Sequence, residues 1–213
     1  MKIISNTAIS LDGRIGTKDL SHLKLGSDFD SKEMSRIRSQ ADAVLMGGNT
    51  FRNSPCPLFT QRNTELEPMW NVILTRSGNL PISQSYLDEK RIKTLVFSPS
   101  FNKNFSCERF ESIVYDKEDF LPFVLANLAQ RGIKTLLIEA GGDLIFRFLK
   151  AGLIDEMYIT LCPKFIGERG APTLLDGEGF RPERTKSAKL ESAKIVDDEI
   201  YLHYKICERG KKD

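Results

Sequence analysis

The chain has 213 residues, of which 31 are Lys or Arg and 29 are Asp or Glu, so its formal net charge is only +2. That near-balance, without a basic stripe or interleaved aromatic residues, argues against nucleic acid as the main partner. No apolar run approaches the roughly 20 residues that a membrane-spanning helix needs, which argues against a membrane segment.

Hydrophobic periodicity predicts strands and helices in alternation. The first helix has Ser27 as its cap, and the second has Asp116 as its cap and Gly132 at its end. In chain order we expect strand 2–8, helix 28–40, strands 43–46, 71–74 and 94–97, helix 118–131, strand 135–138, helix 142–151, and strands 157–161, 189–196 and 199–206. This order predicts an α/β fold with a mixed, mainly parallel sheet flanked by helices and a C-terminal antiparallel hairpin.

The sequence predicts one domain. No Pro-, Ser- or Gly-rich linker divides the chain, so we expect a single domain over residues 1–213 with a basic tail at about 208–213. The first predicted strand begins at Lys2, which leaves no room for a signal peptide and predicts a cytoplasmic location.

Two glycine pairs are the most informative local feature. Gly47-Gly48 follows the apolar run 43–46, and Gly141-Gly142 follows the run 135–140. Glycine lets backbone N–H groups approach a ligand, and a helix that begins at Gly142 would point its unpaired N–H groups at an anion. The alternative is that both pairs are ordinary tight turns. Because both follow a predicted strand, where open α/β sheets bind ligands, the pattern favours a nucleotide site.

Other common site chemistries have little support in the sequence. The four cysteines form no Cys-x-x-Cys pair, and we expect small buried thiols at Cys56, Cys107, Cys162 and Cys207. With only His22 and His203, a histidine-based metal site is not expected, and His203 lies in an alternating strand pattern typical of a structural residue. Neither the P-loop pattern nor Gly-x-Gly-x-x-Gly occurs, which excludes two standard nucleotide-binding motifs.

Several strings, taken in order from about residue 3 to 206, resemble the reductase domain of riboflavin biosynthesis. They are Ser10-Leu11-Asp12-Gly13-Arg14-Ile15, residues 36–47, Thr50, Pro57-Leu58, Arg62, and residues 139–142, 152–156 and 163–167. The resemblance implies a dihydrofolate-reductase-like fold, a homodimer, and NADPH-dependent reduction of a ribosylamino-pyrimidine phosphate to its ribitylamino form. The His-x-Glu and Pro-Cys-x-x-Cys motifs of the deaminase often fused to this domain are absent from the sequence, so we expect a reductase alone.

The resemblance also implies a set of cofactor contacts. They fall at Ile9, Thr50, Ser54, Arg76, Gly141, Gly142, Asp143 and Leu144. The backbone near Ile9 would contact the nicotinamide carboxamide, and residues 141–144 would wrap the pyrophosphate. Arg76 follows a predicted strand, and its guanidinium suits the 2′-phosphate of NADPH, although an exposed turn arginine is an equal alternative. Family members usually carry Asp at the position of Ser54.

On the substrate side the resemblance implies contacts at Arg38, Leu58, Arg62 and Glu139. Two arginines suit a phosphorylated sugar because each guanidinium can bond two phosphate oxygens. Glu139 is the predicted catalytic residue, since its carboxylate could stabilise positive charge on the imine before hydride arrives; alternatively, it only holds the Gly141-Gly142 loop in shape. No metal is expected.

Two departures from the family pattern fall in the predicted substrate pocket. Residues 21–26 lack the family's Ser-x-Trp, and the Pro55-Cys56-Pro57 loop is one residue out of register with the usual pattern. These departures leave two alternatives open. One is a reductase of the same fold that acts on a pteridine or other heterocycle, and the other is a nucleotide-binding module without turnover.

Overall fold

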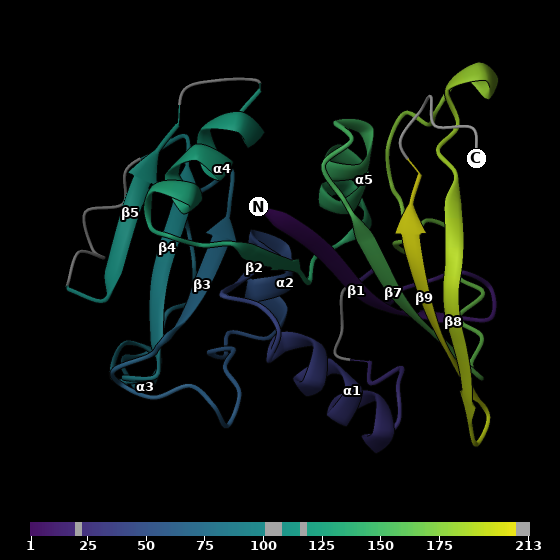
Figure 1. Ribbon diagram of the computed structural model, residues 1–213, viewed down its shortest axis with the longest axis horizontal. Coiled ribbons are helices and arrows are strands. Elements are labelled where there is room, and N and C mark those ends of the chain that lie inside the picture. The colour runs from purple at the N-terminus through teal and green to yellow at the C-terminus, as the bar shows by residue number, and fades with distance from the viewer. Residues whose placement is uncertain (20–22, 101–107, 116–118, 208–213) are drawn as a thin grey trace. The chain divides into compact units, whose positions relative to one another are not determined.

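The computed structural model describes residues 1–19, 23–100, 108–115 and 119–207, which fall into two compact units (Figure 1). The first unit comprises Met1 and Ser35–Glu139, and the second comprises Lys2–Met34 and the chain from Ala140 onward. The boundary therefore lies within helix α1 (Asp28–Arg38). The single domain over residues 1–213 stays a prediction, and the predicted cap Asp116 and the basic tail 208–213 lie outside the described residues.

The first unit is a parallel sheet with helices. Its elements are β2 (Ala43–Gly47), α2 (Gly48–Asn53), β3 (Met69–Leu74), α3 (Gln84–Leu87), β4 (Ile92–Ser98), β5 (Phe110–Val114), α4 (Leu121–Gln130) and β6 (Thr135–Ile138). The strand order is β5-β4-β3-β2-β6, and every neighbouring pair in it is parallel. All strands therefore end at the same edge, which is where side chains that follow them can gather.

The core of this unit explains why its strands are nearly continuous apolar runs. Several strand residues are 0% exposed: Ala43, Val44, Leu45, Val72, Ile73, Leu95, Phe97, Leu136, Leu137 and Ile138. A parallel sheet covered on both faces leaves no solvent side for polar residues. Helix α4 contributes Phe123, whose ring meets Phe97 of β4 edge to face at 6.3 Å between centroids.

The second unit holds the predicted hairpin. Its strands are β1 (Lys2–Ser10), β7 (Glu156–Cys162), β8 (Ala188–Val196) and β9 (Glu199–Ile206), and its helices are most of α1, α5 (Gly142–Lys150) and the 3-10 turn η1 (Pro182–Arg184). β1 and β7 are parallel, while β9 is antiparallel to both β7 and β8. The mixed, mainly parallel arrangement with a C-terminal antiparallel hairpin confirms the predicted fold class.

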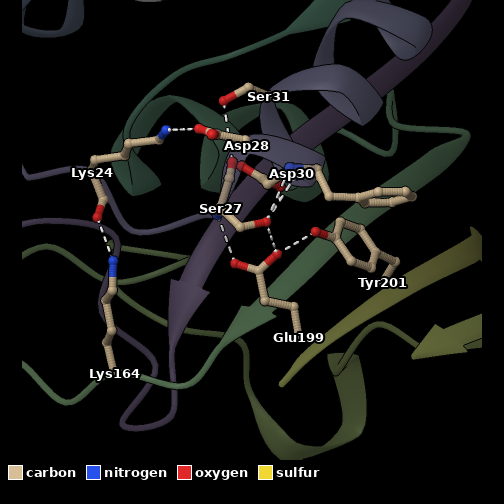
Figure 2. Close-up of polar contacts among 9 residues, drawn as sticks. Lys24, Ser27, Asp28, Asp30, Ser31, Lys164, Glu199 and Tyr201 are labelled. Carbon is tan, nitrogen blue, oxygen red and sulfur yellow. Dashed lines mark hydrogen bonds and ion pairs between the residues drawn. The ribbon is translucent and has the colours of Figure 1, made fainter. Parts of the chain in front are cut away.

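A buried carboxylate anchors the start of α1 to this hairpin, as Figure 2 shows. Glu199 of β9 is 5% exposed and accepts hydrogen bonds from the Ser27 N–H at 2.7 Å, the Ser27 hydroxyl at 2.6 Å and the Tyr201 hydroxyl. The Ser27 hydroxyl oxygen in turn accepts from the N–H groups of Phe29 and Asp30 at 3.2 and 3.3 Å. Ser27 is therefore the cap that the sequence predicts.

Other helix ends follow the sequence as well. Gly132 and Gly152, which come just after α4 and α5, have positive φ angles of 78° and 71°, a conformation that glycine adopts without strain. Asp42 separates α1 from β2, and its carboxylate accepts the N–H groups of Lys134 and Thr135 at 2.8 Å each. Among the helices that the described ranges contain, none has the length and apolarity to cross a bilayer.

The cysteine prediction is wrong for two residues. Cys56, in the loop after α2, and Cys207, just beyond β9, are exposed, because each lies outside the packed elements. Cys162 at the end of β7 is buried, and burial raises the pKa of its thiol to about 12. Cys107 lies outside the described residues. His203 has the structural role expected, since its ring stacks on Tyr158 at 4.2 Å and its Nε2 lies 3.1 Å from the Glu156 carboxylate.

Candidate functional site

Two of the predicted substrate residues form a bidentate ion pair in the first unit. Arg38 is the last residue of α1, and Glu139 directly follows β6, where its N–H donates to the Leu45 carbonyl at 2.9 Å. The Arg38 Nε and Nη2 donate to the two carboxylate oxygens of Glu139 at 2.8 and 2.7 Å. The side chains are only 15% and 12% exposed, so water screens the pair weakly.

The electrostatics of this pair favour the charged guanidinium. Burial alone would lower the pKa of Arg38, but the adjacent Glu139 carboxylate outweighs burial and raises it. Parallel N–H···O bonds of this kind also fix the relative plane of the two groups. A phosphate that binds Arg38 must therefore use another part of the guanidinium or compete with Glu139. The Glu139 carboxylate, just after the end of β6, is therefore paired with the Arg38 guanidinium.

The loop after α2 carries the other two predicted substrate residues. The backbone of Leu58 is bonded to the side chain of Asn71 on β3. Part of the Arg62 guanidinium is bonded within the protein, because its Nη2 donates to the Ala41 carbonyl at 3.0 Å. Leu58 and Arg62 thus belong to one loop that is tied to the sheet of the first unit.

The first glycine pair begins helix α2 and does not form a tight turn. A Cβ on Gly48 would lie 2.8 Å from the Thr75 hydroxyl oxygen, whereas a Cβ on Gly47 would find its nearest neighbour at 4.0 Å. The predicted cofactor residues Thr50 and Ser54 lie within α2 and at its C-terminal end, where the Ser54 N–H donates to the Thr50 carbonyl at 3.1 Å. Thr75 is 3% exposed, and its hydroxyl has no hydrogen-bond partner among the described residues.

Arg76 follows β3 and is exposed, and the described residues offer its side chain neither a hydrogen bond nor an ion pair. The turn after it is held by Arg52 of α2, whose Nη1 donates to the Asn79 carbonyl at 3.0 Å and whose Nη2 donates to the Asn49 side chain at 2.6 Å. Arg52 therefore joins the start of α2 to the segment that follows Arg76.

The second glycine pair lies in the second unit, at the start of α5, as predicted. Gly141 is the N-cap residue, and no side chain caps the helix there. A Cβ on Gly142 would lie 2.3 Å from the Thr173 carbonyl oxygen, while a Cβ on Gly141 would meet nothing within 4 Å. Asp143 and Leu144 form the first turn, and the Asp143 carboxylate lies 3.2 Å from the Arg147 Nε. Each pair thus has one glycine at which a Cβ would clash and one at which it would not.

The remaining predicted residue of this unit is Ile9, which lies near the end of β1 opposite Leu161 of β7. Nearby, Asp12 joins two of the motif strings: its carboxylate accepts from the Ser10 hydroxyl at 2.6 Å and from the N–H groups of Ile166 and Gly167 at 3.0 and 2.7 Å. These bonds, that from Ser10 most of all, lower the pKa of Asp12 to about 2. This part of the motif has a structural role.

Sequence reasoning missed three residues of these clusters: Asn71, Arg52 and Thr75. Asn71 had a visible signal, because it is a polar residue within the apolar run 69–74. Arg52 and Thr75 had none, since their positions depend on how α2 packs against β3. Within the described ranges, no group of three or more His, Cys, Asp or Glu side chains could hold a metal ion.

Solved structures define the class of fold. RibD from Acinetobacter baumannii matches with a TM-score of 0.81 and 23% identity over 97% of this chain and 58% of that chain. A pyrimidine reductase-like protein from Corynebacterium diphtheriae matches with a TM-score of 0.77 and 18% identity over 97% of this chain and 92% of that chain. The fold is therefore that of the RibD reductase domains, which confirms the dihydrofolate-reductase-like architecture.

The family follows from sequence. Residues 1–201 match the model of the RibD C-terminal domain, and the chain belongs to that family. It is 29% identical over 211 residues to the 2,5-diamino-6-ribosylamino-4(3H)-pyrimidinone 5′-phosphate reductase of Archaeoglobus fulgidus, covering 92% of this chain and 94% of that protein. It is 33% identical over 179 residues to the riboflavin biosynthesis protein RibD of a Synechocystis species, covering 82% of this chain and about half of that protein, 48%.

Proposed function

We propose that this chain is an NADPH-dependent reductase that converts a ribosylamino-pyrimidine 5′-phosphate to its ribitylamino form in riboflavin biosynthesis. The match to the Archaeoglobus fulgidus reductase over nearly the full length of both chains carries this proposal. A second reductase of the same name, from Methanothermobacter thermautotrophicus, is 29% identical over 96% of this chain and 97% of its own length. Both matches cover nearly the full length of the relative as well as of this chain, which supports the same activity for this chain.

The residues present fit a dinucleotide. A Cβ on Gly141 would meet nothing within 4 Å, one on Gly47 would meet only the Thr50 hydroxyl at 4.0 Å, and Thr75 keeps a buried hydroxyl that has no partner among the described residues. We assign Thr50, Ser54 and Arg76 of the first unit to the cofactor, with Arg76 on the 2′-phosphate. In the second unit we assign the backbone at Ile9 to the nicotinamide carboxamide, and Gly141, Gly142, Asp143 and Leu144 to the pyrophosphate. When bound, NADPH would supply the hydride.

On the substrate side we assign the phosphorylated sugar to Arg38 and Arg62, and contact with the pyrimidine to Leu58. Reduction adds a hydride to C1′ of the protonated imine that forms when the ribosylamine ring opens, and the electron pair of the C=N bond passes to nitrogen, which gives a neutral amine. We propose that the Glu139 carboxylate acts on this step by stabilising positive charge on the imine. Its pairing with Arg38 keeps it in place, so the protein contributes position and charge and needs no metal.

We further propose a homodimer in the cytoplasm, with no nucleic acid or membrane as a partner. β8 is the outermost strand of its unit, and its Leu190 and Ile195 are 48% and 74% exposed. An exposed strand with apolar side chains is a surface that natural proteins usually cover. Light scattering at micromolar protein is expected to give the mass of two chains, and a monomer mass would count against this part of the proposal.

A turnover assay tests the proposed function. The purified chain is mixed with NADPH and the ribosylamino-pyrimidine 5′-phosphate in its aminated and its deaminated form, and oxidation of NADPH is followed. We expect turnover with one of the two forms. Turnover only with a pteridine or another heterocycle would replace the substrate, and NADPH binding without any turnover would favour a nucleotide-binding module.

A further inference from the structure

A buried asparagine lies in the middle of the first unit's sheet. Asn71 is 0% exposed on β3, and its register partners are Val44 of β2 and Thr94 of β4. The residues that follow it on the strand, Val72 and Ile73, are also 0% exposed. Asparagine is depleted in strands, and a buried amide destabilises a core unless its donors and acceptor are bonded. The presence of a fully buried asparagine in this apolar strand therefore indicates that Asn71 has a specific role.

The side-chain oxygen and nitrogen of Asn71 both form hydrogen bonds to one residue, Leu58, in the loop that follows α2. The Leu58 N–H donates to the Asn71 Oδ1 at 2.9 Å, and the Asn71 Nδ2 donates to the Leu58 carbonyl at 2.7 Å. The side chain thus imitates the backbone of a neighbouring strand and holds a loop residue that forms no strand of its own. The two bonds compensate the burial of the amide, and they use the only N–H of Leu58.

The residues after Leu58 are held as well. The guanidinium of Arg91 lies 3.8 Å from the centre of the Phe59 ring, and the Asn63 Oδ1 accepts from the N–H and the hydroxyl of Thr60 at 2.8 and 2.9 Å. The Arg62 bond to the Ala41 carbonyl completes the series. Four of five successive residues therefore make specific contacts within the protein, which favours a loop formed before a ligand arrives over one that closes around it.

We propose that Asn71 is a positioning residue of the substrate site, which fixes the Leu58 backbone so that the segment 58–62 forms a rigid wall of the pyrimidine pocket. This inference rests on the proposed function, because it takes Leu58 and Arg62 as substrate contacts. The inference also specifies how Leu58 contacts the pyrimidine. Because the Leu58 N–H is bonded to Asn71, the contact is made by the Leu58 side chain. A preformed wall improves substrate binding because no loop has to be ordered during binding.

Asn71→Leu tests the proposal, because it removes both bonds and keeps the number and the branching of the side-chain heavy atoms. Thr94→Val is the matched control: Thr94 is the register partner of Asn71 on β4, is 2% exposed, and its hydroxyl lies 3.2 Å from the Tyr86 hydroxyl rather than bonding to Leu58. The measurements are KM and kcat for the pyrimidine substrate, the Kd of NADPH, and amide hydrogen exchange at Leu58.

For Asn71→Leu we expect KM to rise about tenfold, the scale of one or two lost hydrogen bonds, with an unchanged Kd for NADPH. The Leu58 amide should be protected from exchange in the wild type and should exchange as fast as an exposed loop amide in this variant. Thr94→Val should keep the wild-type KM and the Leu58 protection. If Asn71→Leu does not fold, Asn71→Thr replaces it, since threonine suits a strand but cannot reach both backbone groups of Leu58.

The results separate the two proposals. An unchanged KM in the Asn71 variant, an equal rise in both variants, or fast exchange at Leu58 in the wild type would overturn the role of Asn71. Absence of turnover with any pyrimidine substrate would instead overturn the proposed function. In that case the Leu58 exchange in the wild type and in the Asn71 variant still decides whether the side chain holds the loop.

Discussion

The second unit contains two helix N-termini that the protein treats in opposite ways. The start of α1 is capped by Ser27 and faces the buried carboxylate of Glu199, so the chain itself supplies the negative charge that a helix N-terminus attracts. The start of α5 has Gly141 as its N-cap, no capping side chain, and open space beside the glycine. The first terminus therefore serves the fold, while the second is the one to which we assign the pyrophosphate in the proposed function.

The strongest way to break this comparison is to fill the crowded glycine of α5. Gly142→Ala places a Cβ 2.3 Å from the Thr173 carbonyl oxygen and 2.8 Å from both the N and the carboxylate Oδ2 of Asp176, and two of these three obstacles are backbone. We expect a loss of about 3 kcal/mol in the free energy of unfolding, the upper part of the range for overpacking. Urea unfolding measures it. Stability within experimental error of the wild type would show that the 173–176 segment moves aside easily.

The next largest effect concerns the carboxylate that precedes this glycine pair in sequence. Glu139→Gln keeps the shape and one acceptor for Arg38 but removes the charge. If Glu139 stabilises the imine, turnover should fall roughly 100-fold, while NADPH binding stays normal. Steady-state kinetics and a cofactor titration check both points. A loss confined to NADPH affinity would show instead that Glu139 only holds the Gly141-Gly142 loop in shape.

A substitution of Arg76 tests whether a side chain, as well as a helix N-terminus, binds an anionic group of the cofactor. Its guanidinium is exposed and unpaired among the described residues, so Arg76→Ala should leave the fold intact. We expect NADPH binding to weaken by about 2 kcal/mol, the scale of a hydrogen bond to a charged group, and NADH binding to stay nearly unchanged. Titrations with both cofactors measure this. Equal losses would remove Arg76 from cofactor selection.

A smaller effect is expected at the capped terminus. Burial alone would raise the pKa of Glu199, but the hydrogen bonds from Ser27 and Tyr201 outweigh burial and lower it. The stabilisation is therefore present above the unfolded-state pKa and is lost as the pH falls through the lower folded-state pKa. Glu199→Gln should cost about 1.5 kcal/mol at neutral pH and flatten the acid side of the stability profile. Glu191→Gln, on exposed β8, is the control and should change neither.

The mildest change converts the open terminus into a capped one. Gly141 has φ −71° and ψ 164°, which any residue can adopt, and a Cβ there meets nothing within 4 Å. Gly141→Asp should alter stability by only a few tenths of a kcal/mol, because glycine and aspartate are both accepted at an N-cap. If the pyrophosphate binds there, NADPH should bind about tenfold more weakly, since two anions would compete. Unchanged affinity would place the pyrophosphate elsewhere.

Much of the fold was predictable because its signals are local. β6 and β9 have the predicted bounds, since each is a short apolar or alternating run between turn residues. β5 was missed because it is a half-exposed edge of its unit, and its alternation of Phe110, Glu111 and Ile113 is too short to stand out. α2 was missed because its first residue, Gly48, is a poor helix former whose position depends on packing against Thr75.

The predicted site likewise divides into residues with a local sequence signal and residues whose role depends on packing. Residues of the motif strings could be named from the resemblance, and Ser27 could be named from capping chemistry alone, because a cap acts over three residues. The departure at residues 21–26 is described only from residue 23, so the position of Ser21 and His22 lies outside the described residues. The conformation of the loop 54–62 could not be predicted by comparing its sequence with the family pattern. It depends on contacts with Asn71, Arg91 and Asn63.

The sequence by itself determined the class of fold, the family and the identity of the candidate residues, because hydrophobic period, turn chemistry and motif order are all carried by neighbours along the chain. Only the tertiary structure decided which of those residues act together. Arg38 and Glu139 are 101 positions apart and Leu58 and Asn71 are 13 apart, yet each pair is joined by two hydrogen bonds. Such bonds depend on distance and direction in space, which only the packing of strands and loops sets.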